Sequence, residues 1–566
     1  MAKAERSVAE LVAMIANKTL ELPEMQREYV WRSTRVRDLL DSLYRGYPSG
    51  VILTWQTSLD VQRNDFAVAT ADQGSGASML LLDGQQRLTS LSAVLRGEHI
   101  NVRGRKRPID ILFNLDHPDE VSLITEVHED DESEDDDIDG LDDAEGLDLQ
   151  TRMRMRTFVV ASKALAALPN WVSVTEVMKT NSDAPFLQKA GVTSLEDPSY
   201  DKYSSRLQRL RGIRDYMYRM DVLEDTMSYE EVTEIFVRVN SLGAKLRSSD
   251  LALAQITARW PGSLSQFKQF QEEIATQGFD LDLGSHLRML VALLTHQVKF
   301  NTVAGLSRDD LEAGWNRAKA ATQYACNFAA ANAGIDSEVL LSSPFALIAL
   351  GYWADSRNFK PSQEEATLMR RWLLTANAKG RWSRGSSETI LNEDLAVLRN
   401  GGGPTQLLDR LQTQMGRLDI QPEDLEGRTA RSALFKTMFL AFKQDGAQDW
   451  FSQIQVSLKH SGSRDRLQFH HIFPRAYLHT ERRELRRAQI DDIANLAFIG
   501  GATNRTISAQ PPSDYLPPLM NAEGDPLGLQ QVPKDPALLI PDRYLDFLTA
   551  RRTLIAQRLN TYLHGN

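Results

Sequence analysis

Near the start of the chain, the hydrophobic positions alternate between helical spacing and the continuous runs of buried strands. Apolar residues recur on one helical face over 8–15, after a Ser7–Glu10 capping pattern, and again over 36–43. Between these two patterns, Pro23 favours an extended segment or loop. The runs 51–55 and 79–82 are typical of buried strands. We therefore expect an α+β domain at this end of the chain.

The rest of the chain follows other patterns. Apolar spacing from about 252 to 455 is mainly helical. Further on, the sequence predicts a strand at 467–469, a basic helix-like segment at 481–490, a strand at 494–500 and a helix opening at 501. The expected fold is multidomain and mainly α with α+β parts. The expected domains are 1–251, a helical coupling domain at 252–455 and a ββα-containing domain at 456–566.

The composition is that of a soluble globular protein and gives little sign of a special compartment. Among 566 residues, 42% are hydrophobic and 25% are charged. No apolar run reaches the length of a membrane span. Cys326 is the single cysteine, which excludes a disulfide framework and a thiolate metal site. We expect a cytoplasmic protein, with a homo-oligomer left open.

The charge is unevenly distributed. The chain carries a net charge of −11, but fourteen acidic residues and no Lys or Arg lie between Glu126 and Asp148. The rest of the chain is therefore slightly basic. Segment 126–150 is typical of a solvated, disordered insert, and a DNA mimic acting in cis is the alternative. Arg152, Arg154 and Arg156 then precede a predicted strand, where they either meet phosphates or pair with the acidic insert.

A histidine pair followed by two asparagines is the strongest candidate for chemistry. His470 and His471 are adjacent, and Asn495 and Asn504 follow at intervals of 24 and 9 residues. Each residue alone has an ordinary interpretation, a surface pair or a helix cap. The order of the four on a strand–strand–helix pattern with many arginines favours phosphodiester hydrolysis, because histidine titrates near neutral pH and a bound cation stabilises charge on phosphate.

Another candidate site is the turn after the predicted strand at 79–82. Asp83-Gly84-Gln85-Gln86-Arg87 joins a strand to a helix, where backbone N–H groups can converge on an anion. Arg87 offers a fork of donors for phosphate, and Asp83 can hold magnesium. A single glycine that only allows a bend is the plainer alternative. No Walker A pattern occurs in the chain.

Two later segments are candidates for ligand contact. Residues 235–243 precede a new helix that we expect to be capped at Ser248 or Ser249, and an ordinary helix connection explains them equally well. Segment 380–387 is basic and aromatic, which favours contact with a nucleic-acid backbone over a loop with its tryptophan tucked against a helix. The residues concerned are Arg381, Trp382 and Arg384.

The N-terminal motifs resemble the N-terminal domain of the GmrSD class of restriction enzymes, a broad group that includes SspE-like and BrxU-like enzymes. The resemblance rests on Pro23, Gln26-Arg27, Tyr29 and Trp31, followed by Asp83 to Arg87. It implies a ParB/sulfiredoxin-like fold that binds and hydrolyses a nucleoside triphosphate and senses modified DNA. The implied nucleotide-binding residues are Gln26, Arg27, Asp83, Gly84, Gln85, Gln86, Arg87, Arg238 and Asn240.

The C-terminal array resembles the HNH, or ββα-metal, endonuclease motif in its His-Asn-Asn form, over about 466–516. The resemblance implies that His471 is the general base, that His470 and Asn504 hold Mg²⁺ or Mn²⁺, and that Asn495 braces the loop carrying His471. In related nucleases the first position of the doublet is often acidic, so the roles within the pair are less defined than the site. Arg475 and Arg505 are the expected DNA contacts here.

Taken together, the motifs predict a nucleotide-regulated, metal-dependent endonuclease that nicks or cleaves modified phage DNA. One alternative is a nucleotide-gated toxin or an RNA-cutting abortive-infection effector, because HNH chemistry does not select DNA by itself. Another is a DNA-binding regulator without catalytic activity.

Overall fold

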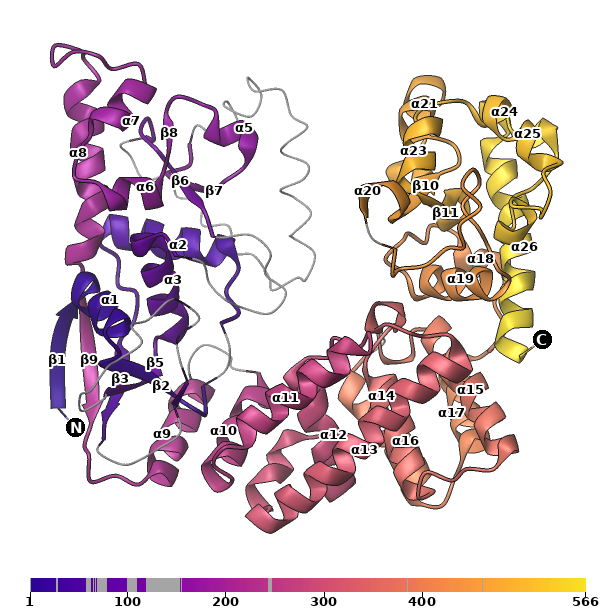
Figure 1. The fold of residues 1–566 in the computed structure, drawn as a ribbon, viewed down its shortest axis with the longest axis horizontal. Helices are drawn as coiled ribbons and strands as arrows, with labels where there is room; N and C mark the ends of the chain where they lie inside the picture. Colours follow the sequence, from indigo (N-terminus) through magenta and orange to yellow (C-terminus); the bar gives the residue numbers. More distant parts are fainter. Residues whose placement is uncertain are drawn as a thin grey trace. The chain divides into compact units, whose positions relative to one another are not determined.

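The computed structural model describes residues 2–26, 29–57, 63–64, 66, 68, 79–98, 109–118, 153, 155–242, 247–383, 385–460 and 462–565. The chain divides into two compact units, Met1–Leu264 and Ser265–Asn566 (Figure 1). Each unit has its own sheets and cores, and each is described by itself below.

A mixed six-stranded sheet organises the first unit. Its order is β1 (Ala2–Ser7), β9 (Met217–Leu223), β3 (Ile52–Gln56), β5 (Met79–Asp83), β2 (Leu20–Pro23) and β4 (Arg63–Asn64). Strand β3 pairs in parallel with β9 and antiparallel with β5. The predicted strands over 51–55 and 79–82 are confirmed, as is the extended conformation at Pro23. These strands are apolar along their length because both faces of the sheet are covered.

The first face of this sheet packs on three helices. They are α1 (Val8–Ala16), α2 (Ser33–Arg45) and α3 (Gln85–Arg96), and one core joins Leu11, Leu40, Leu88 and Ile52. The predicted capping box is present, since Ser7 Oγ accepts from the Glu10 N–H and the Glu10 carboxylate accepts from the Ser7 N–H. The amphipathic patterns thus predicted both helices and the surface that they bury.

The other face packs on a second core with α9 (Tyr229–Leu242) and α10 (Ser248–Arg259), where Trp55 and Phe236 meet. The cap of α10 predicted at Ser248 or Ser249 is wrong by one or two residues. The N-cap is Arg247, and the carboxylate of Asp250 accepts its N–H at 3.2 Å. Ser248 is instead the first helical residue, because Asp250 supplies the capping carboxylate from inside the first turn.

A smaller layer completes the first unit. It contains the antiparallel sheet β7 (Phe158–Val160), β6 (Ile111–Asn114) and β8 (Trp171–Ser173). The helices α5 (Lys163–Ala166), α6 (Val174–Lys179), α7 (Ala184–Lys189) and α8 (Tyr200–Arg211) accompany it. The predicted strand at 158–160 is confirmed. The acidic insert, Arg152 and Arg154 lie outside the described residues.

Helices dominate the second unit up to residue 455, as predicted. They are α11 (Ser263–Thr276), α12 (Leu283–Thr295), α13 (Arg308–Ala333), α14 (Phe345–Ser356), α15 (Gln363–Ala378), α16 (Ser387–Arg399), α17 (Pro404–Met415), α18 (Pro422–Leu425) and α19 (Ala433–Gln444). The described residues between 265 and 455 form no strand beyond an isolated bridge between Gln448 and Gln455.

The end of the chain contains the predicted strand–strand–helix order. Strand β10 (Leu467–His471) pairs antiparallel with β11 (Leu496–Gly500), and α23 (Gly501–Ile507) follows directly (Figure 1). The later helices are α24 (Pro512–Tyr515), α25 (Pro517–Met520) and α26 (Tyr544–His564). The basic helix-like segment expected at 481–490 is helical only at its two ends, where α21 (Arg475–Glu481) finishes and the short α22 (Arg487–Ile490) lies. Arg482, the C-cap of α21, donates from its side chain to the carbonyl of Pro541 at 2.6 Å.

The structure contradicts the predicted DNA contact of Arg381 and Trp382. Both side chains are buried, with 1% and 2% exposed. Arg381 forms a two-pronged ion pair with the buried Asp394, with Nε 2.9 Å from Oδ2, and Trp382 packs edge-on against Trp372. The basic, Gly- and Ser-rich segment 380–387 resembles a surface loop in sequence. Its Arg381 is buried because Asp394, 13 residues further on, forms an ion pair with it inside the fold. Arg384 lies outside the described residues.

This pair gives a prediction for stability. Asp394→Asn leaves the Arg381 guanidinium buried without a counter-charge, so we expect the second unit to lose about 3–5 kcal/mol in urea unfolding. The matched control is Glu312→Gln, which removes the exposed Arg308–Glu312 pair on α13. The control should cost less than about 0.5 kcal/mol. Equal losses in the two variants would contradict the proposed importance of the buried pair.

Candidate active site

The pairing of β10 with β11 sends the two histidines to opposite sides of the ribbon. His470 lies opposite Ala497 and His471 opposite Leu496. The His470 side chain is buried, with the residue 3% exposed, and the His471 side chain is 18% exposed. The two rings therefore have separate partners and can perform separate tasks.

His470 meets the predicted ligand Asn504, which α23 brings back over the strand. The ring Nδ1 lies 2.8 Å from Asn504 Oδ1. On the other side of the ring, Nε2 lies 3.3 Å from the hydroxyl of Tyr515. That hydroxyl donates to the carbonyl of Ile472 at 2.7 Å, so its oxygen is left to accept from His470 Nε2.

This arrangement fits a divalent cation. In the tautomer that donates from Nε2, the Nδ1 lone pair faces the Asn504 oxygen, where a cation would lie between the two atoms; in the other tautomer, Nδ1 donates to that oxygen. Two ligands at about 2.1 Å on neighbouring corners of an octahedron lie about 3 Å apart, close to the observed 2.8 Å. Burial lowers the pKa of His470 to about 4, which keeps the ring in the neutral form that binds metals. Tyr515 supplies the second hydrogen bond that metal-binding histidines commonly make.

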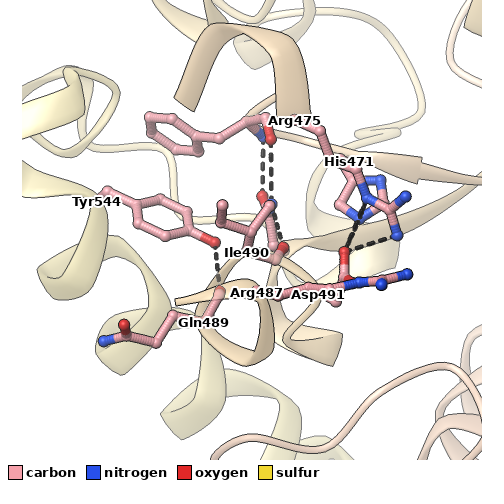
Figure 2. A network of polar contacts seen from close by, with 9 residues as sticks. His471, Arg475, Arg487, Gln489, Ile490, Asp491 and Tyr544 are labelled. Carbon is pink, nitrogen blue, oxygen red and sulfur yellow. Dashed lines mark hydrogen bonds and ion pairs between the residues drawn. The ribbon is translucent and has the colours of Figure 1, made fainter. Parts of the chain in front are cut away.

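His471 is held by an acidic partner that sequence reasoning missed. Its Nε2 lies 3.0 Å from Asp491 Oδ1, and Arg475 and Arg487 also reach this carboxylate, at 2.7 and 3.4 Å (Figure 2). Although burial raises the pKa of Asp491, the hydrogen bond from His471 and the charge of Arg475 lower it overall. Arg475 Nε also lies 3.3 Å from His471 Nε2, but its N–H is closer to Asp491 Oδ1, at 2.8 Å. An ionised carboxylate only accepts, so we assign the donor to His471 Nε2 and the lone pair to Nδ1.

The charge state of His471 suits a general base. Burial and then the nearby charge of Arg475 lower its pKa below the ordinary histidine value, and Asp491 opposes this shift only in part. The ring is therefore neutral near pH 7 and has a lone pair available for a proton.

Asn495 makes the contacts that a bracing role requires. Its side chain is fully buried and spans two segments, accepting from the Phe473 N–H at 2.8 Å and donating to the carbonyls of Phe473 and Ile490. Its own carbonyl accepts from the Ile472 N–H at 2.7 Å. The turn after His471 is thus tied to the segment that carries Asp491 (Figure 2).

Two buried charges support the ribbon from outside the motif. Asp449 accepts from the Gly500 N–H at 2.6 Å and from the Thr503 hydroxyl at 2.7 Å, at the junction of β11 and α23. Arg551 of α26 is fully buried and donates to the carbonyls of Ala494 and Gln530. No local pattern around either residue indicated these contacts.

The structure places Arg475 and Arg505 on the surface of this region. Arg475 is 52% exposed and bonded to Asp491, and the exposed Arg505 donates to the carbonyl of Ser463 at 3.1 Å. Among the described residues there is no cluster of three or more His, Cys, Asp or Glu side chains suited to a metal.

In the first unit, the Arg87 guanidinium forms hydrogen bonds within the chain. It donates to the carbonyls of Ser49 and Val51 at 2.5 and 2.8 Å and to Asp83 at 3.0 Å. The fit is tight, since a Cβ at Gly50 would lie 2.6 Å from its guanidinium. Arg87 therefore fixes the loop before β3, and the Asp83 side chain, 41% exposed, is the more accessible group of the motif.

The glutamines of this motif also bind backbone. Gln86 Oε1 accepts from the N–H groups of Val30 and Trp31, and Gln26 donates to the carbonyls of Leu81 and Leu82. Gln85 is buried, and Gly84 has a φ of 104°, a conformation that favours glycine. The motif holds the segment after β2 against the turn that begins α3.

The remaining predicted nucleotide ligands are not gathered there by any contact that the structure describes. Arg238 is exposed on α9 and pairs with Glu234 at 2.7 Å. Arg27 and the side chain of Asn240 lie outside the described part of the chain.

The family comparison identifies a known domain that the first part of the chain resembles. Within the described residues, no helix is both long and apolar enough to cross a membrane. No curated protein matches the chain. Residues 8–257 match the family model of the GmrSD restriction endonuclease N-terminal domain, and this part of the chain is therefore similar to that domain.

Proposed function

We propose that this protein is a metal-dependent DNA endonuclease of the restriction type that acts in defence against phage. The observation that carries the proposal is the pair of divided histidines, with His470 facing Asn504 and His471 facing Asp491. The GmrSD-type N-terminal region supports restriction and makes DNA the favoured substrate. The HNH resemblance of the ββα segment supports hydrolysis of a phosphodiester.

The two histidines have different tasks in this proposal. His471 takes the proton from the attacking water on Nδ1, while Asp491 holds the ring by Nε2 and stabilises the imidazolium that forms. His470 and Asn504 would hold Mg²⁺ or Mn²⁺, which supplies Lewis-acid stabilisation of charge on the scissile phosphate. Asn495 holds the turn after His471 against the segment before Asp491 through its hydrogen bonds to Phe473 and Ile490.

We further propose that the N-terminal domain binds a nucleoside triphosphate and senses modified DNA, so that hydrolysis controls the nuclease. In this proposal the half-exposed Asp83 contacts the magnesium–triphosphate, and Arg87 positions the loop. Loss of activity in an Arg87 variant would therefore not separate ligand contact from folding.

The nuclease assignment predicts the effect of one substitution. His471→Ala should lower metal-dependent cleavage of phage DNA by a factor of about 10² to 10⁴, the usual contribution of a general base. Asp491→Asn, which keeps the ring but weakens its partner, should lower the rate by up to about 10⁴-fold, because the ring loses the carboxylate that orients it and stabilises the imidazolium. Both are measured as initial rates of plasmid nicking in Mg²⁺ or Mn²⁺, with EDTA as the metal-free reference.

His479→Ala is the matched control, because His479 is an exposed histidine of the same unit. It should cleave DNA at the wild-type rate. Wild-type cleavage by His471→Ala, or cleavage that persists unchanged in EDTA, would refute the assignment.

The nucleotide assignment predicts a substitution that lowers hydrolysis without lowering stability. Asp83→Asn should lower magnesium-dependent hydrolysis of nucleoside triphosphate at least about tenfold, since a carboxylate is the better ligand for this hard cation. The melting temperature should stay close to that of the wild type because Asp83 is half exposed. Phosphate release and calorimetric unfolding measure the two effects.

Asp41→Asn is the control, because Asp41 and Arg45 form the same kind of pair one helical turn apart at 2.7 Å. It should leave hydrolysis unchanged. Equal turnover by Asp83→Asn and the wild type would remove Asp83 from the site.

A further inference from the structure

A cavity of about 800 Å³ lies among helices of the second unit, apart from the histidine pair. It is lined by the C-terminal ends of α15 and α17, by α18 and by the first residues of α19. Its volume lies within the range of ligand sites, roughly 300–1,000 Å³. None of the residues discussed above as catalytic contributes to its wall.

The lining is strongly cationic. Lys379, Arg417, Arg428 and Arg431 face a single carboxylate, Asp424. Arg417 binds that carboxylate at 2.6 Å, and Arg428 Nε donates to the backbone carbonyl of the same residue at 3.2 Å. Arg417 offsets the negative charge of Asp424. The other cationic side chains of the lining then give the cavity a positive potential, which favours anions.

A helix end adds to this potential. Ser432 caps α19, a helix of 12 residues, and the cavity wall includes Ser432, Ala433 and Leu434. The first N–H groups of a helix have no partner inside it, and the helix dipole favours an anion there. The two arginines that directly precede this end, Arg428 and Arg431, are exposed.

The lining also indicates which part of a nucleic acid is bound. Among the described residues that line it, there is no Trp, Tyr, Phe or His ring on which a base could stack. Guanidinium groups match phosphate in geometry and remain charged at any physiological pH. The cavity therefore suits phosphate groups.

The wall of the cavity is bonded to the segment that positions His471. The N–H of Gly427 donates to the Asp492 carboxylate at 2.8 Å, and the carbonyl of Arg428 accepts from the Ile493 N–H at 2.7 Å. Asp492 directly follows Asp491, the partner of His471. A phosphate held by Arg428 is thus held on the same hydrogen-bonded framework as the candidate general base.

We propose that this cavity binds backbone phosphate of the DNA substrate and anchors the duplex for cleavage. The inference rests on the proposed endonuclease function and adds the surface that holds its substrate. Binding there is independent of sequence and of base modification, because only phosphates are contacted.

The test is DNA binding by the full chain in EDTA, where cleavage is prevented. The variant Arg428→Gln/Arg431→Gln keeps the main-chain bonds of both residues and removes two charges. Fluorescence anisotropy with a duplex, repeated across salt concentrations, should show a slope of log K against log salt that is smaller by about 2. The loss should be equal for modified and unmodified duplexes.

Arg308→Gln/Arg317→Gln is the matched control, because it removes two exposed arginines of α13 in the same unit. It should leave the slope unchanged. Thermal melting of both double variants checks that they fold. A wild-type slope in the cavity variant would overturn the proposal.

Competition with inorganic triphosphate distinguishes the sources of phosphate. If triphosphate binding is lost in the cavity variant while its DNA slope stays at the wild-type value, the cavity serves a free anion and the DNA assignment falls. If the wild type cuts DNA and the cavity variant binds it normally, this inference fails alone. If the cavity variant shows the expected smaller slope but the wild type never cuts DNA in Mg²⁺ or Mn²⁺, the endonuclease proposal fails instead.

Discussion

The register of β10 against β11 is the constraint on which the chemistry of the second unit depends. Side chains alternate across a strand, so a slip by one residue would exchange the surroundings of His470 and His471. Aromatic packing opposes such a slip, because Phe469 and Phe498 lie opposite each other in the ribbon and both contact Phe435 of α19. The carboxylate of Asp449 fixes the far end of β11 at Gly500.

Once the register is set, each histidine has an environment that is consistent with the role proposed for it. His470 is enclosed with two neutral oxygen groups, those of Asn504 and Tyr515, which suits a metal ligand. His471 faces a carboxylate shared with arginines, which suits a base that becomes charged only briefly. The sequence leaves the roles within the His470–His471 doublet less defined. The alternation of side chains along β10 places the two rings on opposite faces.

Local patterns predicted most of the elements, with the helix expected at 481–490 as an exception, but they did not predict long-range partners. Apolar spacing predicted α1, α2, β3, β5 and the ββα order, because each depends on residues close in sequence. Asp491 lies 20 residues after His471 and Tyr515 lies 45 after His470, with no spacing rule that links them. Arg381 failed for a related reason, since only the fold reveals that Asp394 receives it. The carbonyls that bind Arg87 likewise lie 36 and 38 residues away.

The most direct test of the central claim is the position of a bound metal. Crystals of the full chain soaked in Mn²⁺ should give an anomalous peak about 2.0–2.3 Å from both His470 Nδ1 and Asn504 Oδ1, with Nε2 of the ring directed at Tyr515. If the soaked crystal shows no anomalous peak beside His470 Nδ1 and Asn504 Oδ1, and the two atoms remain in direct contact, the result would contradict a metal-dependent nuclease centre at this ribbon.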